Sequence, residues 1–437
     1  MNYIAAMSTP PSHQPAWHRE QVEAVTGGHL RQPPIPQQPP APQQHPQVPQ
    51  PTWPQQRYTP QYVPTQAHAN PTVRPGLRTW LLAGSIGVVS VFLAMLFALY
   101  YGFSFGVVAT LVGLIFALIP LVIVLPIFLW LDRLEAEPWQ YLVTAFLYGA
   151  LGSTFIALIV NTSFGIFLTA FTDPASAGML GAVLVAPPVE ESVKGVFILI
   201  MWAVARKRFN GLTDGIVYAG VVAAGFAFTE NIMYLAGALQ EGGVYGFAAT
   251  FVIRGILSPF GHPIYTSMIG IGIGIAATTG SVALRFVAPV AGWTAGVVLH
   301  GLWNFSAGFG LAGLLIGLGV GFVIFCCFVG FVVWTRSREA QIITEHLRPY
   351  VATGWLAPAE LSMLSSMKER RLARGWARNY GRPGSLKAMR AFQDTASELA
   401  LLRFRMTRQF ADPETLHDEL VLLDSMTARR REFAGVG

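Results

Sequence analysis

Long apolar stretches recur through the middle of this 437-residue chain and constrain its fold more than any other feature. Between Leu81 and Trp334, runs of roughly twenty residues contain few or no charges, and this length matches the roughly 30 Å hydrocarbon core of a bilayer. Only 12% of the residues are charged, compared with roughly 25% in an average soluble domain. The sequence therefore excludes a single soluble globular domain and predicts an all-α, polytopic helical membrane bundle.

We expect about eight transmembrane helices, because eight apolar segments of suitable length follow one another. Their expected bounds are residues 80–101, 106–130, 140–164, 179–204, 213–237, 251–279, 286–307 and 311–334. The sixth segment contains Pro259, Gly261 and Pro263. Proline inside a helix removes a hydrogen bond and clashes with the preceding turn, so a break in the backbone is predicted there.

The basic residues between the spans predict the topology. Arg and Lys concentrate in alternate connections, and this is typical of the cytoplasmic side of a membrane. The residues concerned are Arg74, Arg78, Arg133, Arg206, Lys207, Arg208, Arg285, Arg336 and Arg338. The pattern predicts a multi-pass protein of the cell membrane with both termini in the cytoplasm.

Composition divides the chain into three regions. Residues 1–78 are rich in Pro and Gln, and 17 of the 30 prolines precede residue 78; such a segment buries too little apolar surface to fold, so we predict a disordered cytoplasmic tail. Residues 79–335 form the membrane domain. Residues 336–437 contain 17 Lys and Arg against 12 Asp and Glu, which predicts a basic helical cytoplasmic region near anionic lipid. No motif clearly indicates nucleic-acid binding.

Helical patterns recur in the C-terminal region. A helix is predicted over about residues 386–410, because apolar residues follow one another at steps of three and four. This apolar stripe consists of Leu386, Met389, Phe392, Ala396, Leu399, Leu402 and Met406. Asp412 and Pro413 predict the cap and first turn of a last helix.

Ionisable side chains inside the apolar segments are the strongest functional signal. A charge at the bilayer centre costs about 2.5–3.5 kcal/mol on insertion scales, so such residues need partners and mark functional sites. Seven lie within or at the rim of the spans: Glu190, Glu191, Lys194, Glu230, Arg254, His262 and His300. They predict a polar centre inside the membrane domain.

Two of these acids follow a pair of prolines. Pro187 and Pro188 suit only the first turn of a helix, so we expect a helix to restart there with Glu190 and Glu191 in its first turn. Glu190 and Lys194 are four residues apart on one face, and Glu191 is rotated by about 100°. One carboxylate can therefore be held by the lysine while the other faces a cavity.

The following spans bring complementary groups to a similar depth. Glu230 is followed by Asn231, and His262 lies in the interrupted sixth span, where irregular backbone must line a cavity or be buried in protein. His300 and Asn304 share one helical face. At about 1.5 Å per residue, Glu190, Glu230 and both histidines fall between the middle of the membrane and its outer half. They can meet.

Carboxylates and imidazoles around a cavity suit the activation of water. His262, His300 and Glu230 are candidate ligands of a divalent metal, of which zinc is the best match, and an open coordination position lowers the pKa of bound water. A carboxylate could instead accept the water's proton directly, with Asn304 donating to the oxyanion. The spacing does not choose between these mechanisms.

Five motifs occur in a fixed order between about residues 115 and 310. They are Leu131-Asp132-Arg133-Leu134-Glu135-Ala136-Glu137-Pro138-Trp139, Glu190-Glu191-x-x-Lys194, Phe226-x-x-x-Glu230-Asn231, Arg254 followed by Gly261-His262, and His300-Gly301-Leu302-Trp303-Asn304. Together they resemble the PrsW family of intramembrane proteases. In the wider group of CAAX-processing and bacteriocin-immunity proteases, the second of the two acidic motifs usually carries His, so Glu230 favours PrsW.

The resemblance implies an intramembrane endopeptidase, expected to be metal-dependent, that cleaves a membrane-anchored protein such as an anti-sigma factor. It implies an active centre composed of Glu190, Glu191, Glu230, His262 and His300. Lys194, Asn231, Arg254 and Asn304 are then supporting residues. The resemblance does not extend to either terminal region.

Two other functions are compatible with parts of this pattern. A proton-coupled transporter also uses broken helices and acids at mid-membrane, but it predicts a polar path to both faces and an internal repeat, and no clear repeat is visible. A non-catalytic scaffold would leave the buried acids and histidines unexplained.

Overall fold

The computed structural model describes residues 77–134, 137–204, 209, 211–408 and 413–434. Within these ranges the regular secondary structure is entirely helical, which confirms the predicted all-α class. The tail predicted over residues 1–78 lies outside the described residues apart from its last two positions, and so does Asp412.

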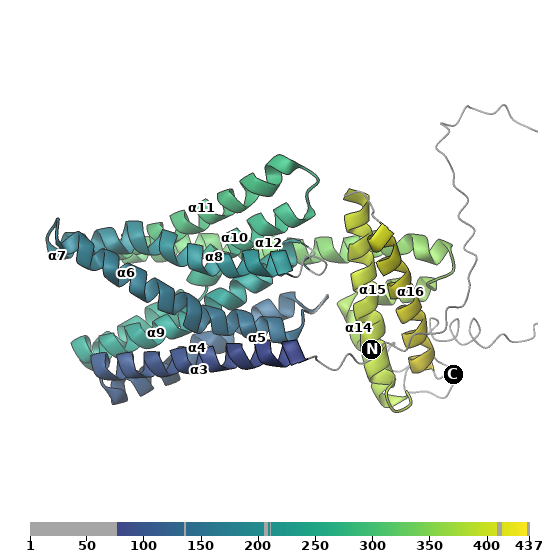
Figure 1. The fold of residues 1–437 in the computed structure, drawn as a ribbon, viewed down its shortest axis with the longest axis horizontal. Coiled ribbons are helices and arrows are strands. Elements are labelled where there is room, and N and C mark those ends of the chain that lie inside the picture. The colour runs from purple at the N-terminus through teal and green to yellow at the C-terminus, as the bar shows by residue number, and fades with distance from the viewer. Residues whose placement is uncertain (1–76, 135–136, 205–208, 210, 409–412, 435–437) are drawn as a thin grey trace, which may run out of the picture.

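The membrane domain is a bundle of long helices lying side by side (Figure 1). Three short π-helical segments, η2, η3 and η4, interrupt its α-helices. The elements are α3 (Leu77–Phe105), α4 (Val107–Leu131), α5 (Trp139–Leu147), η2 (Tyr148–Ser153), α6 (Thr154–Thr169), α7 (Pro174–Leu180), η3 (Gly181–Val185), α8 (Ala186–Val204), α9 (Leu212–Phe251), η4 (Val252–Leu257), α10 (Gly261–Thr278), α11 (Val282–Ala307) and α12 (Gly310–Ala352).

Six stretches of the described chain are long and apolar enough to cross a membrane. One of them, Leu212–Thr278, has 67 residues and contains two of the predicted spans. Its chain turns back at Gly243, whose φ of 58° and ψ of −152° are non-helical. The stretch that contains α8 is not among the six because it carries three charges within a few residues. The predicted number of eight transmembrane helices therefore stays a prediction.

The predicted break in the sixth span is present. The π-helical η4 ends at Leu257, and α10 begins at Gly261 after a short non-helical segment containing Pro259. The predicted helix restart before Glu190 is wrong in one respect. Through η3 the chain passes without a break into α8, so the acids fall in the second turn of α8 rather than the first. The wider π turn accommodates Pro187, which lacks the N–H that a regular α-helix would use.

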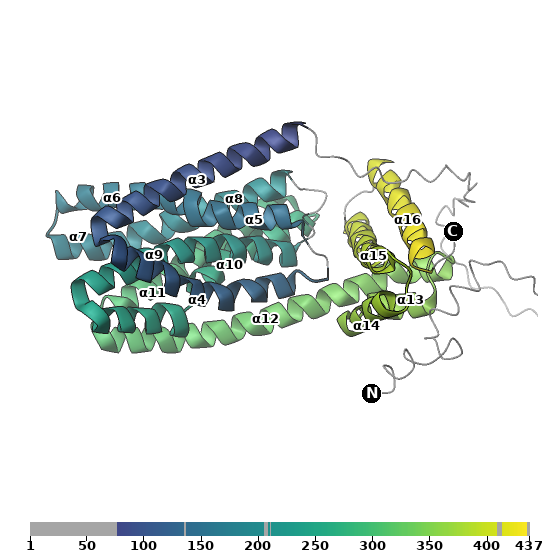
Figure 2. The same cartoon turned by 90° about the horizontal axis from the view of Figure 1, so that it is seen from below.

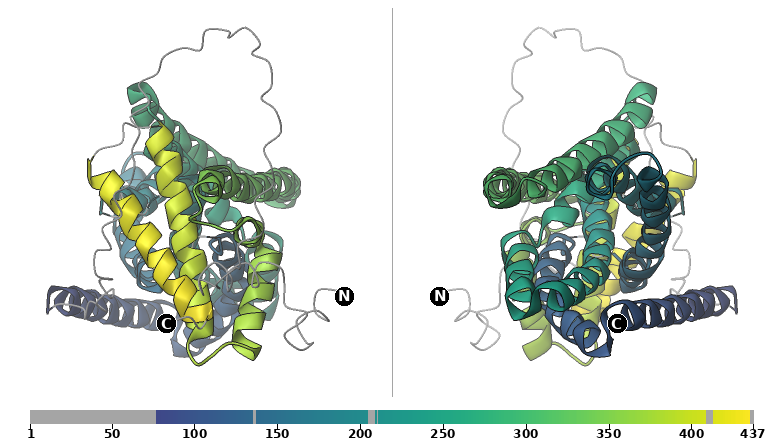
Figure 3. Two further views of the ribbon diagram at one scale, coloured as in Figure 1. Left: turned by 90° about the vertical axis from the view of Figure 1, so that its right-hand side faces the viewer. Right: turned by 90° about the vertical axis from the view of Figure 1, so that its left-hand side faces the viewer.

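Helix α9 is the centre of the bundle. Every residue from Asp214 to Phe226 is buried, and a helix that is apolar all round belongs in a core. In contrast, α3, α11 and α12 expose many large apolar side chains, as expected where helices face lipid. Figure 3 shows α3 leaning away from the other helices.

Glycines allow the central helices to touch through their backbones. A Cβ added to Gly215 of α9 would collide with the carbonyl oxygen of Gly270 in α10, and the reverse also holds. Between α10 and α11, a Cβ on Gly272 would collide with the carbonyl of Ala288. Small residues at helix contacts are typical of membrane bundles because they allow close backbone approach.

The C-terminal region forms a separate group of helices at one end of the bundle. Helix α12 has 43 residues and continues from the bundle into this region (Figure 2). There it meets α13 (Pro358–Leu364), α14 (Met367–Asn379), α15 (Ser385–Arg408) and α16 (Pro413–Ala434). We call α13–α16 the C-terminal module. The start of α3 lies at the same end of the bundle as this module (Figure 2).

The core of the C-terminal module contains much of the predicted apolar stripe of α15. Met389, Phe392, Ala396 and Leu399 are each fully buried. They pack with residues of α12, α13, α14 and α16. The amphipathic pattern of the sequence therefore identified the helix and its buried face.

Candidate active site

Four consecutive helices bring the predicted acids and histidines to one place inside the bundle. Glu190, Glu191 and Lys194 come from α8, Glu230 from α9, His262 from α10 and His300 from α11. Glu190, Glu191, Lys194, Glu230 and His300 are buried. A fifth element, η4, contributes Arg254.

Glu191 is a carboxylate whose oxygens are saturated by donors. The Lys194 Nζ donates to its Oε1 at 2.6 Å, and the Thr266 Oγ1 donates to its Oε2 at 2.8 Å. The Nδ1 of His300 lies 3.1 Å from the same Oε1. Because an ionised carboxylate only accepts, this Nδ1 carries a proton, and in the neutral imidazole the Nε2 of His300 has the free lone pair. Glu191 therefore fixes the tautomer and orientation of His300.

The lysine holds Glu191 rather than Glu190. Lys194 and Glu191 are three residues apart on α8, and both side chains are fully buried. The sequence left open which acid the lysine would hold, because both the i,i+3 and the i,i+4 spacing place side chains on one face. The consequence is that Glu190 is the acid that faces the cavity.

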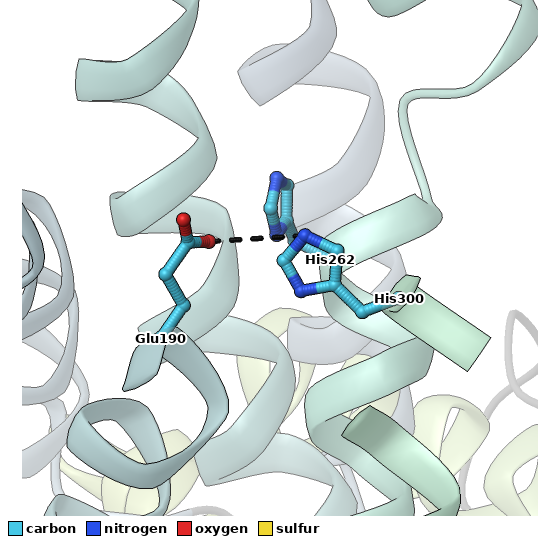
Figure 4. Close-up of side chains that lie close together, drawn as sticks. All are labelled: Glu190, His262 and His300. Carbon is cyan, nitrogen blue, oxygen red and sulfur yellow. Dashed lines mark ion pairs between the residues drawn. The ribbon is translucent and has the colours of Figure 1, made fainter. Parts of the chain in front are cut away.

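Glu190 has one oxygen that is held and one that is free. The Nδ2 of Asn161, on α6, donates to its Oε1 at 3.2 Å. Its Oε2 is buried, has no hydrogen-bond partner, and lies 3.9 Å from the Nε2 of His300. Figure 4 shows the carboxylate pointing toward the two imidazole rings.

Asn161 is a site residue that the sequence reasoning missed. It lies within the third predicted span, residues 140–164. The available signal was an amide in the middle of an apolar helix, where a polar group needs a partner. The sequence could not identify Glu190 as that partner, because α6 and α8 meet only in the folded bundle.

Glu230 organises a second cluster. Its Oε2 lies 2.5 Å from the Nη2 of Arg254 and 2.8 Å from the Nε2 of His262. The Nε of Arg254 also donates to the Oδ1 of Asn231 at 2.8 Å, and its guanidinium group lies 3.9 Å from the centre of the Tyr234 ring. Arg254, which is itself held by Asn231, therefore holds Glu230, and Glu230 in turn orients His262.

Both nitrogens of His262 have partners. The Nζ of Lys194 lies 3.2 Å from its Nδ1, and an ammonium group can only donate. The Nδ1 therefore accepts, and the Nε2 carries the proton that is donated to Glu230. Lys194 thus connects the Glu191 cluster to the Glu230 cluster.

Aromatic rings enclose the two histidines. The ring centroids of His262 and His300 are 4.9 Å apart at 88°. Tyr265 stacks on His300 with centroids 5.3 Å apart at 20°, and Phe226 packs against His262 at 5.3 Å. The Phe226 ring also lies 4.4 Å from the Lys194 Nζ. These contacts limit rotation of both imidazoles and surround the charges with apolar groups.

The centre offers a ligand set for a metal ion. One ligand atom each from Glu190, His262 and His300 lies within 4.8 Å of the others, and two His with one carboxylate is a common catalytic zinc set. The free Oε2 of Glu190 and the free Nε2 of His300 fit this role directly. His262 fits it once Lys194 releases the Nδ1. Glu230, named as a ligand from the sequence, is bound to Arg254 and His262 instead.

The charges of the centre also suit a cation. Three carboxylates, Glu190, Glu191 and Glu230, stand against two fixed cations, Lys194 and Arg254. When all three acids are ionised, the formal balance is 3 − 2, one excess negative charge. An additional positive charge near Glu190 would offset it.

Asn304 lies beside the centre rather than in it. Its Nδ2 donates to the carbonyl oxygen of Ala182 in η3 at 2.8 Å. This bond uses one of the two N–H groups of the amide, and the role of Asn304 as an oxyanion donor stays a prediction. In the described structure Asn304 connects α11 to η3, close to the start of α8.

An apolar cavity of about 900 Å³ borders the centre. Its walls come from η4, α10, α11 and α12, and its lining includes Gly261 and Tyr265, which flank His262, and Trp303, which follows His300 by one turn. Several lining side chains, such as Leu302 and Ile316, are exposed on the outer surface of the bundle. The cavity thus lies between the lipid-facing surface and the acid–histidine centre.

Comparison with known proteins gives consistent results. Residues 137–335 match the sequence model of the PrsW family intramembrane metalloprotease. The chain is 31% identical over 157 residues to Protease PrsW of Geobacillus kaustophilus, covering 36% of this chain and 63% of the relative. It is 37% identical over 106 residues to Protease PrsW of Clostridioides difficile, covering 24% and 42%. Protease PrsW of Oceanobacillus iheyensis is 27% identical over 190 residues, covering 41% and 75%.

These matches concern the membrane domain. The chain spans less than two thirds of the length of the first two relatives, and no solved structure matches it. The matched range contains every acid and histidine of the centre, whereas the C-terminal module lies beyond it. Over residues 137–335, this chain is therefore similar to the PrsW family of intramembrane proteases.

Proposed function

We propose that this protein is an intramembrane endopeptidase that hydrolyses a peptide bond of a membrane-anchored protein at the centre formed by Glu190, His262 and His300. The observation that carries the proposal is the pair formed by Glu190 Oε2 and His300 Nε2. The Oε2 of Glu190 is buried without a hydrogen-bond partner, and it lies 3.9 Å from the Nε2 of His300. A water molecule between them would contact a proton acceptor on each side.

In the proposed reaction, the Oε2 of Glu190 accepts a proton from the attacking water. The water oxygen bonds to the scissile carbonyl carbon, the carbon–nitrogen bond breaks, and Glu190 returns the proton to the leaving amine. Glu191 keeps the lone pair of His300 Nε2 directed at the site, and Glu230 orients His262. Asn161 holds the other oxygen of Glu190 and so fixes the direction of the base.

As the alternative to this direct base catalysis, we propose that Glu190, His262 and His300 hold a divalent metal ion, with Glu190 Oε2 as a ligand rather than the base; zinc is the best match to the donor set. Such an ion, when bound, polarises water and the substrate carbonyl. The free donor atoms of Glu190 and His300 support this assignment, and the description of the matched family names metalloproteases. For His262 Nδ1 to bind the ion, the contact between Lys194 Nζ and this nitrogen would have to break, while Lys194 keeps its contact with Glu191.

The apolar cavity supports a substrate that reaches the centre from within the membrane. It holds about 900 Å³, and its lining is dominated by side chains such as Phe309 and Ile316, which suit a lipid-embedded peptide segment. We infer that the substrate is a single-span protein, such as an anti-sigma factor or a similar membrane-anchored regulator. The placement of α3 and the C-terminal module at one end of the bundle (Figure 2) supports a topology with both termini in the cytoplasm.

A proton-coupled transporter remains the alternative. It would need a polar path from the centre to both membrane faces. Helix α9 leads from the centre toward one face, and between Gly215 and Phe226 its only polar side chain is that of Tyr218. This apolar stretch favours hydrolysis over transport.

The test is cleavage of a single-span reporter by the purified full-length chain reconstituted in liposomes. Glu190→Gln should reduce the rate at least 100-fold, because general base catalysis contributes about 10²- to 10⁴-fold. The matched control is Glu345→Gln, at an exposed acid of α12 outside the bundle, which should cleave at the wild-type rate. Wild-type cleavage by a folded Glu190→Gln variant would refute the assignment of the base.

A further inference from the structure

Exposed tryptophans place the membrane surface at the end of the bundle next to the C-terminal module. Trp130 is the penultimate residue of α4, Trp139 begins α5, and Trp334 lies in α12 where its apolar part ends; their exposures are 38%, 68% and 54%. Tryptophan is enriched at the level of the lipid headgroups. The connection from α4 to α5 therefore lies at that level.

The C-terminal module is attached to this connection. Arg370 of α14 is buried, with 1% of its surface exposed, and its Nη1 donates to the carbonyl oxygen of Leu134 at 2.9 Å. The Oγ of Ser397 on α15 donates to the same carbonyl at 2.9 Å. The Leu134 side chain is itself part of the core of the module. These contacts fix α14 and α15 next to the headgroup level.

Basic side chains from four elements gather at this junction. The guanidinium group of Arg336, two residues after Trp334, lies 3.9 Å from the Trp130 ring. The other members of the group are exposed or half-buried. They are Arg133 after α4, Arg371 and Arg374 on α14, and Lys387 and Arg390 on α15.

The arginines are close enough to act on one another. Burial lowers the pKa of Arg374, and repulsion from Arg390, Arg133 and Arg371 lowers it further, while Asp394 opposes the effect. Three arginines from three different elements therefore lie close enough to repel Arg374, whereas only one acid, Asp394, is among the charged groups that act on it. Such an arrangement is costly unless a negatively charged partner is present.

We propose that Arg133, Arg371, Arg374, Lys387 and Arg390 form a surface that binds the headgroups of anionic phospholipids in the adjacent leaflet. Lipid is the partner because these cations lie at the level that the tryptophans mark, where the headgroups are already present. Anionic headgroups attract each nearby Lys or Arg. A shallow depression on α15, whose charged lining residues are Lys387, Arg390 and Asp394, offers room for a headgroup beside the two cations. This inference does not depend on the proposed proteolysis.

The test uses the full-length protein purified in neutral detergent and titrated with dioctanoyl phosphatidylglycerol, dioctanoyl phosphatidylcholine or glycerol phosphate. Native mass spectrometry would count the bound molecules. The wild-type chain should retain phosphatidylglycerol at least tenfold more strongly than phosphatidylcholine. The triple variant Arg371→Glu, Lys387→Glu and Arg390→Glu, in which all three positions are exposed, should lose this preference.

The matched control reverses three exposed arginines that are not among the groups acting on Arg374, namely Arg348→Glu, Arg378→Glu and Arg431→Glu. It should retain the preference, and thermal unfolding should show both triple variants folded. Equal retention of the two lipids by the wild type would overturn the proposal. So would binding of glycerol phosphate as strong as that of the lipid, or a preference for an RNA oligonucleotide over phosphatidylglycerol.

Discussion

The adjacent acids Glu190 and Glu191 should respond in opposite ways to the same substitution. Glu191 accepts hydrogen bonds from three donors, and Lys194, at 2.6 Å, is fully buried. Glu191→Gln removes the negative charge and leaves the Lys194 ammonium without a counter-ion. Because breaking a buried ion pair from one side costs about 3–5 kcal/mol, we expect the free energy of unfolding to fall by that amount.

Glu190→Gln should cost little stability. Its Oε2 has no partner, and a glutamine can still accept from Asn161 through its carbonyl oxygen. A buried charge without a paired cation is itself unfavourable, so this variant should be as stable as the wild type or more stable. Its cleavage of the reporter should nevertheless be lost.

The assay is unfolding of the purified protein by titration with a denaturing detergent, followed by circular dichroism. A double variant, Glu191→Gln with Lys194→Met, should recover most of the lost stability, because it removes both members of the pair. It should remain inactive if Glu191 orients His300. Equal destabilisation by Glu190→Gln and Glu191→Gln would contradict the division of roles between the two acids.

Three further predictions concern the metal, the topology and the loop after α4. Chelation should abolish cleavage and Zn²⁺ should restore it, with less bound metal in His262→Ala and His300→Ala; a fully active preparation with far less than one metal per chain would instead support direct base catalysis. Reporter fusions at Gly437 and next to Glu241 should report opposite sides of the membrane, and the same side for both would disprove the eight-span topology. Burial raises the pKa of Asp132 to about 8, well above its unfolded value of about 3.9, so the folded state binds more protons and stability should fall as the pH rises from about 4 to about 8. The variant Asp132→Asn should lose less stability over this pH range, with a difference from the wild type of at most about 1.4 kcal/mol for each unit of pKa shift. If the free energy of unfolding of the variant has the same pH dependence as that of the wild type, the assignment to Asp132 is wrong.

Most of the centre could be predicted because the membrane makes unpaired polar groups costly. Glu190, Glu191, Glu230, His262 and His300 lie on four neighbouring spans at similar depth, and such groups must find one another. The expected gathering of these side chains is present in the structure. Their number and helical positions were readable without knowing how the helices pack.

The finer arrangement could not be predicted from local pattern. Lys194 could reach either Glu190 or Glu191. Which of the two acids it binds depends on the positions of His300 and Thr266 in the folded bundle. The π-helical η3, which moves the two acids into the second turn of α8, has no reliable sequence signal. These features depend on the packing between helices rather than on spacing along one helix.

The C-terminal region illustrates the same limit. The period of its apolar residues predicted α15 and its buried face, since that pattern is local. The contact of Arg370 with the carbonyl of Leu134 joins residues 236 positions apart, and a basic residue in an amphipathic helix gives no indication that it will be fully buried. Only the folded chain reveals that the module is attached to the membrane domain at this point.

The glycine contacts of the central helices determine which parts of the bundle can separate. Because the backbones of α9 and α10 touch at Gly215 and Gly270, we expect the helices that carry Glu230 and His262 to move together. The contact of Gly272 with Ala288 adds α11 to that group. We therefore expect any opening of the bundle to occur at its periphery, for example at α6 or along the edge of α12, while the two histidines keep their mutual geometry.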